Sequence, residues 1–253
     1  MTTIGVQGVT GRTGRTVVET ATDREDVTVA FGISQTDPDT DTPTYDPDER
    51  AAALDTHTPD AVIDFSEPAA AVSLAGVCAD ADVPLVVGTT GFDDDQFAAL
   101  RRVSKRTPVL KATNFARGVQ ALLAALGPAL ESLPGYDVEL LETHHNGKRD
   151  APSGTASTLL DRIAEYREFE TVPGREGIQP RDSNEVGVLV RRAGDVRGEH
   201  EVLLAGNNEL LTLTHRAEDR GVFGAGALDA ATWLVGRDPG WYSFEDVVTT
   251  DRP

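Results

Sequence analysis

Short hydrophobic runs alternate with amphipathic segments through the first half of the chain. Runs rich in valine, leucine and isoleucine predict strands over residues 2–7, 27–33, 60–65, 84–88 and 107–113. Apolar positions at helical spacing predict helices over residues 12–21, 68–79 and 93–103. Strands joined through single helices run parallel, because the connection must cross over the sheet. The pattern therefore predicts an α/β fold with a doubly wound parallel sheet that is covered on both faces.

The pattern changes near residue 114. A long alanine- and leucine-rich helix is followed by a predicted strand over residues 136–145, a loop, and a helix that begins at Ser153. Alternating segments separated by glycine and asparagine turns then predict an antiparallel or mixed sheet in a second domain, over residues 185–195, 198–206 and 209–217. Residues 218–235 return to a helical pattern, which raises the possibility that the chain re-enters the first domain.

The chain is strongly acidic, since 23 Lys and Arg stand against 42 Asp and Glu and give a formal net charge of −19. Such a chain is repelled by phosphate backbones and by anionic lipid headgroups, so neither nucleic acid nor a membrane is expected as a partner. Much of the charge falls in residues 34–48, which lack apolar periodicity and are predicted to form an exposed loop. Only three residues are lysine. A lysine-poor, acidic surface is typical of proteins from a salt-rich cytoplasm, where charges are strongly screened, and the alternative is an acidic protein from ordinary salt.

The single cysteine, Cys78, lies in an apolar run and has no partner for an intramolecular disulfide. We expect it to be buried as a small hydrophobic residue. The first residues form a strand-like stretch without a basic segment and apolar leader, and no apolar run reaches the roughly 18 residues that span a bilayer. A cytoplasmic protein is therefore expected.

A glycine-rich turn joins the first predicted strand to the first predicted helix. Gly8, Gly11 and Gly14 are spaced three residues apart in GVTGRTGR. Glycines at this joint allow a tight turn, leave room for a pyrophosphate beside the backbone amides and permit close packing of helix on strand, while Arg12 or Arg15 adds positive charge. A joint that serves packing alone has a similar sequence. Its placement at the first strand of an alternating series favours dinucleotide binding.

The end of the second predicted strand does not decide which dinucleotide binds. An acidic residue there holds the ribose hydroxyls of NAD, and a cationic one accommodates the 2′-phosphate of NADP. The strand ends instead in Ser34 and Gln35, with Asp37 slightly beyond. Because both side chains hydrogen-bond either group, NADH and NADPH are both candidate cofactors.

The densest group of reactive side chains lies in ETHHNGKRDAPSGTA, residues 142–156. The segment contains His144, His145 and Lys148, and histidine is the side chain best suited to general acid catalysis near neutral pH, while lysine adds a positive charge or a proton. Downstream, Gly154 and Thr155 open a helix whose free amides suit a carboxylate. The combination predicts an acid site for a carboxylated substrate.

Each feature of this segment also has an ordinary structural explanation. Paired histidines in a loop are commonly solvated, and SGTA is a common helix start, but their combination in one short segment favours catalysis. Adjacent histidines do not form a helical ligand pair, and the spacing of the other three histidines does not suit a metal, so no metal is expected. Those three are interpreted as polar surface or loop residues: His57, His200 and His215.

These residues resemble the signature of the dihydrodipicolinate reductase family. ETHHNGKRDAPSGTA carries most of the resemblance, and GVTGRTGR, VIDFSEP, VVGTTGF, TNFARGV and RAGDVRGEHEVLLAG resemble other family segments, so the resemblance spans nearly the whole chain. It implies a Rossmann-like dinucleotide-binding domain built from both chain ends, residues 1–114 and 219–253. It also implies an inserted α+β domain with a mixed sheet, residues 115–218, that binds substrate and forms a homotetramer.

The resemblance also implies roles for individual residues. His144 is expected to donate the proton and Lys148 to be the second catalytic residue, while the substrate carboxylates are expected to contact His145, Gly154 and Thr155. The cofactor is expected to lie against Gly8, Val9, Thr10, Gly11, Arg12, Thr13, Ser34 and Gln35. Its nicotinamide is expected to be flanked by Gly88, Thr89, Thr90, Ala112, Thr113, Asn114 and Phe115. Relatives that use NADPH commonly carry an arginine near the position of Ser34.

The implied activity is that of a 4-hydroxy-tetrahydrodipicolinate reductase in the diaminopimelate route to lysine. Hydride passes from NADH or NADPH to C4 of an unsaturated cyclic imine dicarboxylate, and C3 is protonated. Another two-domain NAD(P)-dependent dehydrogenase, acting on an amino acid or semialdehyde, shares the glycine-rich turn but has no evident reason to carry HHNGKRDAPSGT. A non-catalytic nucleotide sensor gains nothing from two histidines and a lysine clustered in its second domain.

Overall fold

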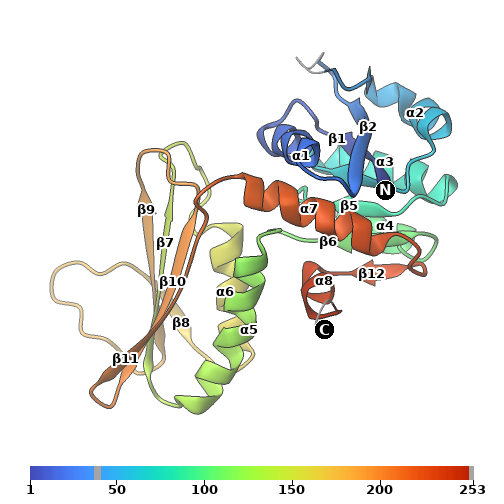
Figure 1. Cartoon of the computed structure of the whole chain (residues 1–253). Helices are drawn as coiled ribbons and strands as arrows, with labels where there is room; N and C mark the ends of the chain where they lie inside the picture. Colours follow the sequence, from blue (N-terminus) through green and yellow to red (C-terminus); the bar gives the residue numbers. More distant parts are fainter. Residues whose placement is uncertain (37–40, 251–253) are drawn as a thin grey trace. The chain divides into compact units, whose positions relative to one another are not determined.

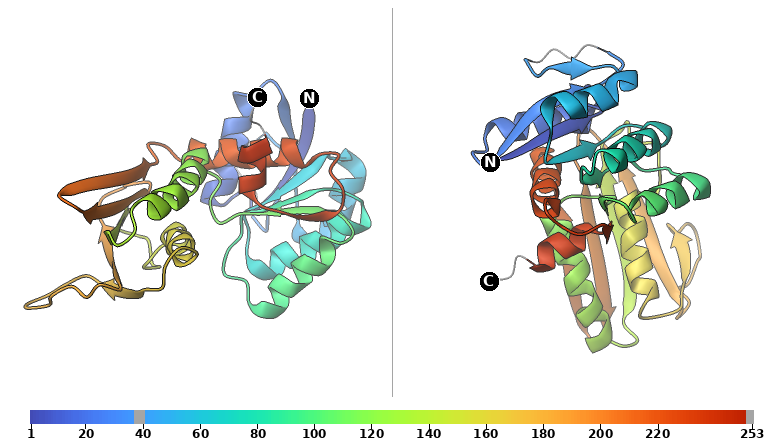
Figure 2. Two further views of the ribbon diagram at one scale, coloured as in Figure 1. Left: turned by 90° about the horizontal axis from the view of Figure 1, so that it is seen from below. Right: turned by 90° about the vertical axis from the view of Figure 1, so that its right-hand side faces the viewer.

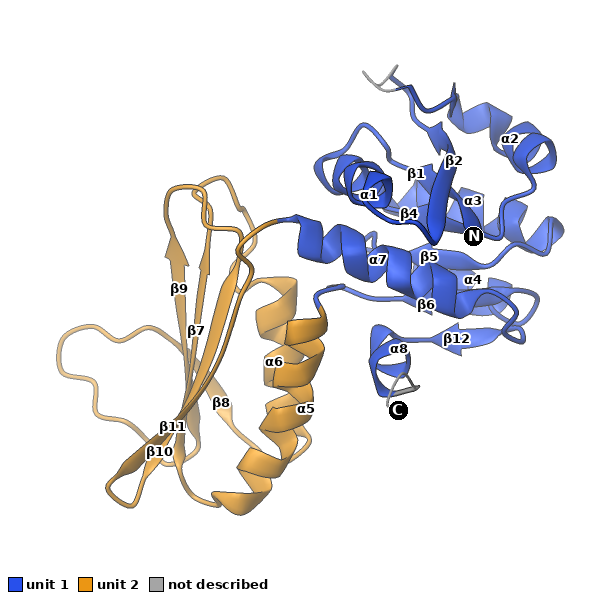
Figure 3. Cartoon of the chain, in the orientation of Figure 1, with its two compact units in different colours: residues 1–116, 220–253 blue, residues 117–219 orange. Residues whose placement is uncertain are grey.

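The structure is a computed structural model that describes residues 1–36 and 41–250, so Asp37 lies outside the described residues. The chain divides into two compact units (Figure 3). Unit 1 consists of Met1–Ala116 together with Arg220–Pro253, and unit 2 consists of Arg117–Asp219.

Unit 1 contains a seven-stranded sheet in which all paired strands run parallel (Figure 1). Its order is β12-β6-β5-β4-β1-β2-β3. The strands are β1 (Thr2–Gln7), β2 (Val27–Ile33), β3 (Thr44–Tyr45), β4 (Ala61–Asp64), β5 (Leu85–Val87), β6 (Pro108–Lys111) and β12 (Gly240–Tyr242). The predicted doubly wound parallel sheet is confirmed.

Helices cover both faces of this sheet (Figures 1 and 2). They are α1 (Arg12–Thr22), α2 (Arg50–His57), α3 (Pro68–Asp80), α4 (Asp94–Val103), α7 (Gly221–Leu234) and α8 (Phe244–Thr250). Residues of α1, α7 and α8 enclose a core around Ile4 and Val6 on one face, and residues of α2, α3 and α4 enclose a second core around Phe31 and Val62 on the other. Burial on both faces explains why the strands are apolar without alternation.

The end of the chain returns to unit 1, as the helical pattern after residue 218 suggested. Helix α7 packs along α1, and a Cβ atom on Gly224 would lie 2.8 Å from the backbone oxygen of Thr16, so glycine permits the close approach of the two helices. Strand β12 then pairs with β6, where Trp241 lies opposite Val109. Residues from both chain ends therefore build one sheet.

The prediction of an exposed loop over residues 34–48 is partly wrong. Strand β3 pairs parallel with the end of β2, and a short 3₁₀ helix follows at Pro47–Glu49. The Tyr45 ring lies edge-on to Phe31, and its hydroxyl lies 2.9 Å from Nε2 of His57. These contacts come from other elements and stabilise a strand too short to show a pattern of its own. His57 also stacks on Phe31, so it is not a free surface residue.

Unit 2 contains a five-stranded mixed sheet with the order β11-β10-β7-β9-β8. The strands are β7 (Asp137–His144), β8 (Glu170–Pro173), β9 (Glu185–Arg192), β10 (Glu199–Gly206) and β11 (Glu209–Arg216). Strand β9 pairs parallel with β7 and β8, whereas β10 pairs antiparallel with β7 and β11. Helices α5 (Arg117–Ser132) and α6 (Gly154–Ala164) lie on one face of the sheet (Figures 1 and 2). The predicted mixed sheet is confirmed.

Cys78 is fully buried in α3, as its apolar surroundings predicted. Burial raises the pKa of its thiol far above the ordinary value, so the thiol is inert toward chemistry that needs a thiolate. Among the residues that the structure describes, no helix combines the length and apolar character needed to cross a bilayer.

Candidate functional site

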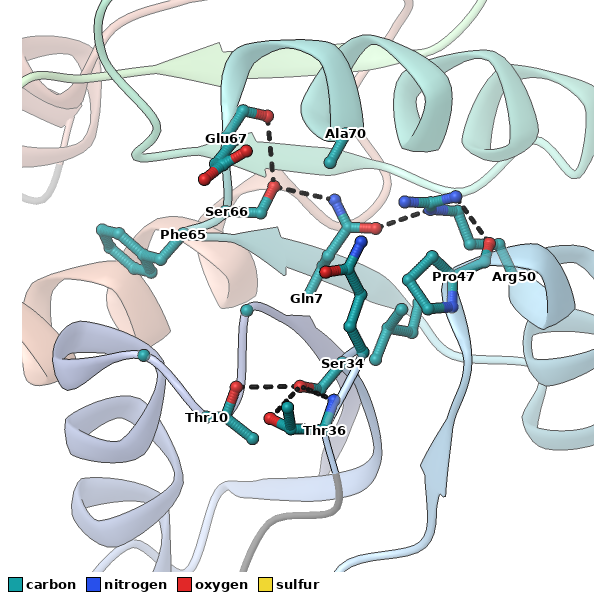
Figure 4. Close-up of a pocket in the computed structure, with 14 residues that line it drawn as sticks. Gln7, Thr10, Ser34, Thr36, Pro47, Arg50, Phe65, Ser66, Glu67 and Ala70 are labelled. Atoms are coloured by element: carbon teal, nitrogen blue, oxygen red, sulfur yellow. Dashed lines mark hydrogen bonds between the residues drawn. The ribbon is translucent and has the colours of Figure 1, made fainter.

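A pocket of about 370 Å³ lies at the carboxyl ends of β1, β2 and β4 in unit 1. The chain runs from β1 outward to β3 and then crosses to β4 on the other side of β1, so the pocket lies where the strand order reverses. Open α/β sheets bind ligands at such a point. Predicted cofactor residues that line the pocket are Gly8, Thr10, Gly11, Ser34 and Gln35 (Figure 4).

Each glycine of the glycine-rich turn serves a different structural purpose. Gly8 has a φ of 81°, which favours glycine, and its amide donates to the carbonyl oxygen of Ile33 at 3.0 Å. Gly11 caps α1 without a side-chain hydrogen bond, and the first turn carries no acidic residue. A Cβ on Gly14 would lie 2.1 Å from the oxygen of Gly8. The turn therefore presents free amides at a helix N-terminus, which suits a pyrophosphate.

The side chains of the other residues in this turn differ in their accessibility to a ligand. Val9 is 1% exposed and packs against Gly32, so only its backbone is available. Arg12 is exposed and Thr13 is half-buried, both in the first turn of α1. A phosphate at this helix start would thus have a cation nearby.

Hydroxyl groups connect the turn to the end of β2. The Oγ1 atom of Thr10 lies 2.8 Å from Oγ of Ser34, and Oγ of Ser34 accepts a hydrogen bond from the amide of Thr36 at 3.1 Å. Residues 34–36 carry no charge. Their side chains hydrogen-bond a ribose hydroxyl or a phosphate equally, so the geometry fits both dinucleotides.

A buried polar network beneath the pocket was not predicted from the sequence. Asp64 is fully buried at the end of β4 and accepts hydrogen bonds from Thr89 and Ser66, each at 2.5 Å, and from Gln7 at 2.8 Å. Burial raises the pKa of Asp64, although these hydrogen bonds oppose the shift. The guanidinium of Arg50 donates to Gln7 at 2.6 Å (Figure 4). The hydroxyl of Thr89 is therefore committed to the network.

The first loop expected beside the nicotinamide is packed against aromatic rings. A Cβ on Gly88 would lie 2.1 Å from the ring of Phe65, so only glycine fits. Phe65 in turn packs edge-on against Phe115, which is 2% exposed and belongs to the core. Thr90 is exposed. Only the backbone of Phe115 is thus open to a ligand.

The second such loop follows β6. Ala112 is 9% exposed, Thr113 is exposed and Asn114 is half-buried. The side-chain oxygen of Asn114 accepts a hydrogen bond from the amide of Ala116 at 2.8 Å, which holds the loop where the chain leaves unit 1.

In unit 2, the strand register brings four reactive side chains to the helix-covered face of the sheet. Glu142 and His144 are two residues apart on β7, so their side chains leave the same face. Antiparallel β10 places His200 opposite Glu142, and parallel β9 places Arg192 opposite His144. This group was not predicted, because three strands contribute to it.

Glu142 is fully buried at the centre of this group. Its Oε1 atom accepts hydrogen bonds from the amide of Ser153 at 3.0 Å and from Arg192 at 2.9 Å. Its Oε2 atom lies 2.9 Å from Nδ1 of His144. Burial alone would raise the pKa of Glu142, but these donors outweigh it and hold the pKa far below its usual range. The carboxylate is therefore charged throughout the neutral range.

His200 is 3% exposed, and its interpretation as a polar surface or loop residue is wrong. Its Nε2 atom lies 3.1 Å from Oγ of Ser153, which already accepts from the amide of Ala156 at 3.2 Å. The hydroxyl of Ser153 and Nε2 of His200 therefore share one hydrogen bond inside the buried group. Burial, followed by the nearby charge of His144, lowers the pKa of His200 to about 4.

The predicted proton donor, His144, is 9% exposed at the end of β7. Its Nδ1 atom faces Glu142, and its Nε2 atom faces Gly198, where an added Cβ would lie 3.2 Å away. Gly198 has a φ of 156°. The ring therefore faces Glu142 on one side and the backbone of Gly198 on the other, where a Cβ would crowd Nε2.

The predicted residues downstream of His144 lie on the loop between β7 and α6. The ammonium of Lys148 pairs with the carboxylate of Asp150 at 2.7 Å. Burial opposes ionisation of Asp150, but the hydrogen bond from Lys148 lowers its pKa overall. His145 is half-buried on the same loop. Lys148 is thus close to His144 in sequence, and its ammonium pairs with Asp150 rather than with Glu142.

Helix α6 begins as the sequence predicted. Ser153 is its N-cap, and the hydroxyl oxygen accepts from the amide of Ala156 at 3.2 Å. Gly154 is exposed and Thr155 is 7% exposed, in the first turn. The first turn contains no acidic residue. Its amides are therefore suited to a substrate carboxylate.

The ligand atoms of Glu142, His144 and His200 all lie within 4.8 Å of one another, a grouping that could hold a metal ion and that residue spacing did not predict. The guanidinium of Arg192 already binds the same carboxylate, and Oγ of Ser153 occupies Nε2 of His200. A dication would compete with both. The chemistry of the donor set therefore favours a hydrogen-bonded network around one carboxylate.

We expect acid to destabilise unit 2 through His200. The unfolded side chain takes up its proton near pH 6.5 and the folded one only near pH 4, so the unfolded state binds more protons between these values. The free energy of unfolding is expected to fall by about 3 kcal/mol on acidification through this window. Chemical denaturation at constant salt, from pH 7.5 to pH 4, measures it, and His200→Gln is expected to flatten the dependence. Parallel curves for the two proteins would contradict the assignment of a neutral His200.

Two family models match the chain. The model described as dihydrodipicolinate reductase, N-terminus, matches residues 2–115, and the one described as dihydrodipicolinate reductase, C-terminus, matches residues 118–248. Both matches together cover nearly the whole described chain.

Curated relatives from halophilic archaea are similar over their full length. The 4-hydroxy-tetrahydrodipicolinate reductase of Haloarcula marismortui is 58% identical over 248 residues, which cover 98% of this chain and 99% of the relative. That of Natronomonas pharaonis is 56% identical over 245 residues, which cover 96% and 98%. Among solved structures, the dipicolinate-bound dihydrodipicolinate reductase from Paenisporosarcina sp. TG-14 has a TM-score of 0.81 at 24% identity and covers 97% of this chain and 99% of that chain. At this identity the structural match supports the fold.

Proposed function

The chain belongs to the dihydrodipicolinate reductase family, and from this premise we propose that it reduces 4-hydroxy-tetrahydrodipicolinate to tetrahydrodipicolinate with NADH or NADPH. The observation that carries the proposal is the position of His144, which lies against the buried carboxylate of Glu142 near the start of α6. An acid and a carboxylate-binding helix start are the two features that this substrate requires. Loss of water from the 4-hydroxy compound gives the cyclic imine that is reduced.

The proton at C3 is assigned to Nε2 of His144. That atom lies against Gly198, which places no side chain over it, while Nδ1 faces Glu142. A carboxylate on one nitrogen stabilises positive charge on the ring and orients the other nitrogen toward the substrate. Lys148 supplies a further positive charge as negative charge develops on the ring of the substrate.

The substrate carboxylates are assigned to the first turn of α6 and the loop before it. The amides of Gly154 and Thr155 lie at the positive end of the helix dipole, and the Ser153 cap fixes this turn. His145 is assigned to the same carboxylates. The arrangement selects a dicarboxylate because one acidic group alone leaves cationic partners unpaired.

The cofactor is assigned to the pocket of unit 1, which lies in the part of the chain that matches the N-terminal family model. The turn is too tight for a side chain at Gly14 and presents the amides at the start of α1, which suits a pyrophosphate there. When bound, the dinucleotide supplies the hydride. Gly8–Thr13 hold its phosphates, Ser34 and Gln35 hold the adenosine ribose, and the loops at residues 88–90 and 112–115 flank the nicotinamide.

A homotetramer formed through unit 2 is part of the proposal. Helices α5 and α6 cover one face of the five-stranded sheet, and the other face is uncovered within the unit (Figure 1). Leu189 and Leu210 are exposed on its strands, at 43% and 70%. We assign the contact between copies to this uncovered face of the sheet. Sedimentation in high salt measures the assembly state.

The test is oxidation of the reduced nicotinamide, followed by absorbance with freshly generated 4-hydroxy-tetrahydrodipicolinate, in parallel with NADH and NADPH and at high and low salt. Turnover is expected to require the dicarboxylate and to be greatest in high salt, because the charge of −19 is then screened. The ratio of turnover with NADH to turnover with NADPH measures how residues 34–36 discriminate between the two cofactors. A folded protein that oxidises neither cofactor with this substrate, but reduces NAD+ or NADP+ with an amino acid or oxidises NADH or NADPH with a semialdehyde, would identify a different dehydrogenase.

A further inference from the structure

A single carboxylate in unit 2 contacts both parts of the proposed substrate site. Oε2 of Glu142 lies 2.9 Å from Nδ1 of His144, and Oε1 accepts from the amide of Ser153 at 3.0 Å. Ser153 is the N-cap of α6. The same side chain therefore contacts the proton donor on β7 and the start of α6, to which the substrate carboxylate is assigned.

Arg192 on β9 fixes the position of the Glu142 carboxylate. Arg192 donates to its Oε1 at 2.9 Å and also donates to the backbone oxygens of Asp150 and Arg191, at 2.6 Å and 2.8 Å. With these contacts and full burial, the carboxylate has no freedom to turn toward solvent or substrate. Glu142 thus acts only through the groups that it contacts.

We propose that Glu142 is a positioning residue that aligns His144 for proton donation and, at the same time, fixes the first turn of α6. The carboxylate keeps Nδ1 of His144 turned inward, so that Nε2 points away from Glu142 and toward Gly198, which has no side chain. A general acid must be held in one orientation to deliver its proton, and this contact fixes the orientation of the ring. The proposal rests on the proposed function, because both groups that it aligns are assigned through that function.

His200 completes the second half of the arrangement. It lies opposite Glu142 in the register of β10 on β7, and its Nε2 atom forms a hydrogen bond with the hydroxyl of Ser153 at 3.1 Å. Glu142 holds the amide of Ser153 while His200 holds its side chain. Two contacts from one strand pair thus set the orientation of the helix start.

The experiment separates the two contacts of Glu142 by comparing Glu142→Gln with Glu142→Ala in the full-length protein. Glutamine keeps an oxygen that accepts from Ser153 but removes the negative charge beside His144. We expect kcat to fall by about 10²-fold or more, since a positioned general acid contributes about 10²- to 10⁴-fold. The Kd for pyridine-2,6-dicarboxylate, used as the probe, is expected to change by less than about threefold. Alanine removes both contacts, and we expect kcat to fall and this Kd to rise about tenfold or more.

The matched control is Glu139→Gln, the same change on the same strand. Glu139 lies on the opposite face of β7 and pairs with Arg181. The kcat of the Glu139→Gln protein is expected to stay within about twofold of that of the unsubstituted protein. Binding of NADH, followed by fluorescence, confirms that unit 1 is folded in every variant.

The outcomes separate failure of this inference from failure of the proposed function. If Glu142→Gln retains kcat within about threefold, or if kcat and dicarboxylate affinity fall together in that variant, Glu142 does not align the acid, and the inference is overturned. Loss of kcat with retained dicarboxylate affinity supports it. If the unsubstituted protein itself shows no turnover with the dicarboxylate substrate, the proposed function fails first.

Discussion

Replacing His144 by glutamine is expected to lower kcat by about 10²- to 10⁴-fold and to leave the Kd for NADH unchanged. Glutamine fits the space at the end of β7 and forms hydrogen bonds, but its amide does not release a proton near neutral pH. The cofactor pocket is formed by residues of unit 1 alone, whereas His144 belongs to unit 2. Steady-state turnover and fluorescence titration with NADH measure the two effects separately.

The control for this change is His215→Gln on β11. His215 is half-buried in unit 2 and lies opposite His200 in the register, without contact to the carboxylate of Glu142. Its kcat is expected to stay within about threefold of the unsubstituted protein. If His144→Gln also retains full turnover, the proton at C3 comes from another group, and Lys148 becomes the first candidate.

Replacing Gly14 by alanine is expected to disrupt the nucleotide pocket of unit 1. The added Cβ would lie 2.1 Å from the oxygen of Gly8 and 3.0 Å from the Cα of Val9. Neither atom can move freely, because the oxygen of Gly8 accepts from the amide of Gly11 and the amide of Gly8 donates to β2. We expect the free energy of unfolding to fall by about 3 kcal/mol and the Kd for NADH to rise at least about tenfold.

Gly76→Ala is the matched control, since it makes the same change within helix α3. An added Cβ at Gly76 meets no atom within 4 Å. Alanine lowers the conformational freedom of the unfolded chain, so the free energy of unfolding is expected to rise by about 0.5–1 kcal/mol. Chemical denaturation measures both variants. A Gly14→Ala protein as stable as Gly76→Ala, with normal NADH binding, would contradict the close packing of the turn.

The sequence predicts the longer elements of this fold because burial imposes a period on them. Strands β1, β2 and β4 are apolar runs since helices cover both of their faces, and β10 alternates since one face is covered. Strand β3 and helix α2 were not predicted. The two elements contact each other through Tyr45 and His57, and Tyr45 also contacts Phe31 of β2. Contacts between residues that are far apart in the sequence leave no local pattern.

The candidate site was predictable where its residues are consecutive. His144, Lys148 and Ser153 lie within one short segment, and lysine and histidine are rare in this chain. Glu142 gave no signal, because it is one of 42 acidic residues. Arg192 and His200 reach the site only through the register of β9 and β10 on β7. A pairing of strands, rather than any spacing along the chain, brings them to Glu142.

The insertion of unit 2 into unit 1 sets an order of events during translation. Arg117–Asp219 is continuous and leaves the ribosome complete, whereas unit 1 still lacks α7 and β12 at that stage. The face of the first sheet around Ile4 and Val6 is then covered by α1 but still lacks α7 and α8. Nascent chains with exposed apolar surface are prone to aggregate. We therefore expect this chain to be most prone to aggregate between the synthesis of Asp219 and that of Leu234.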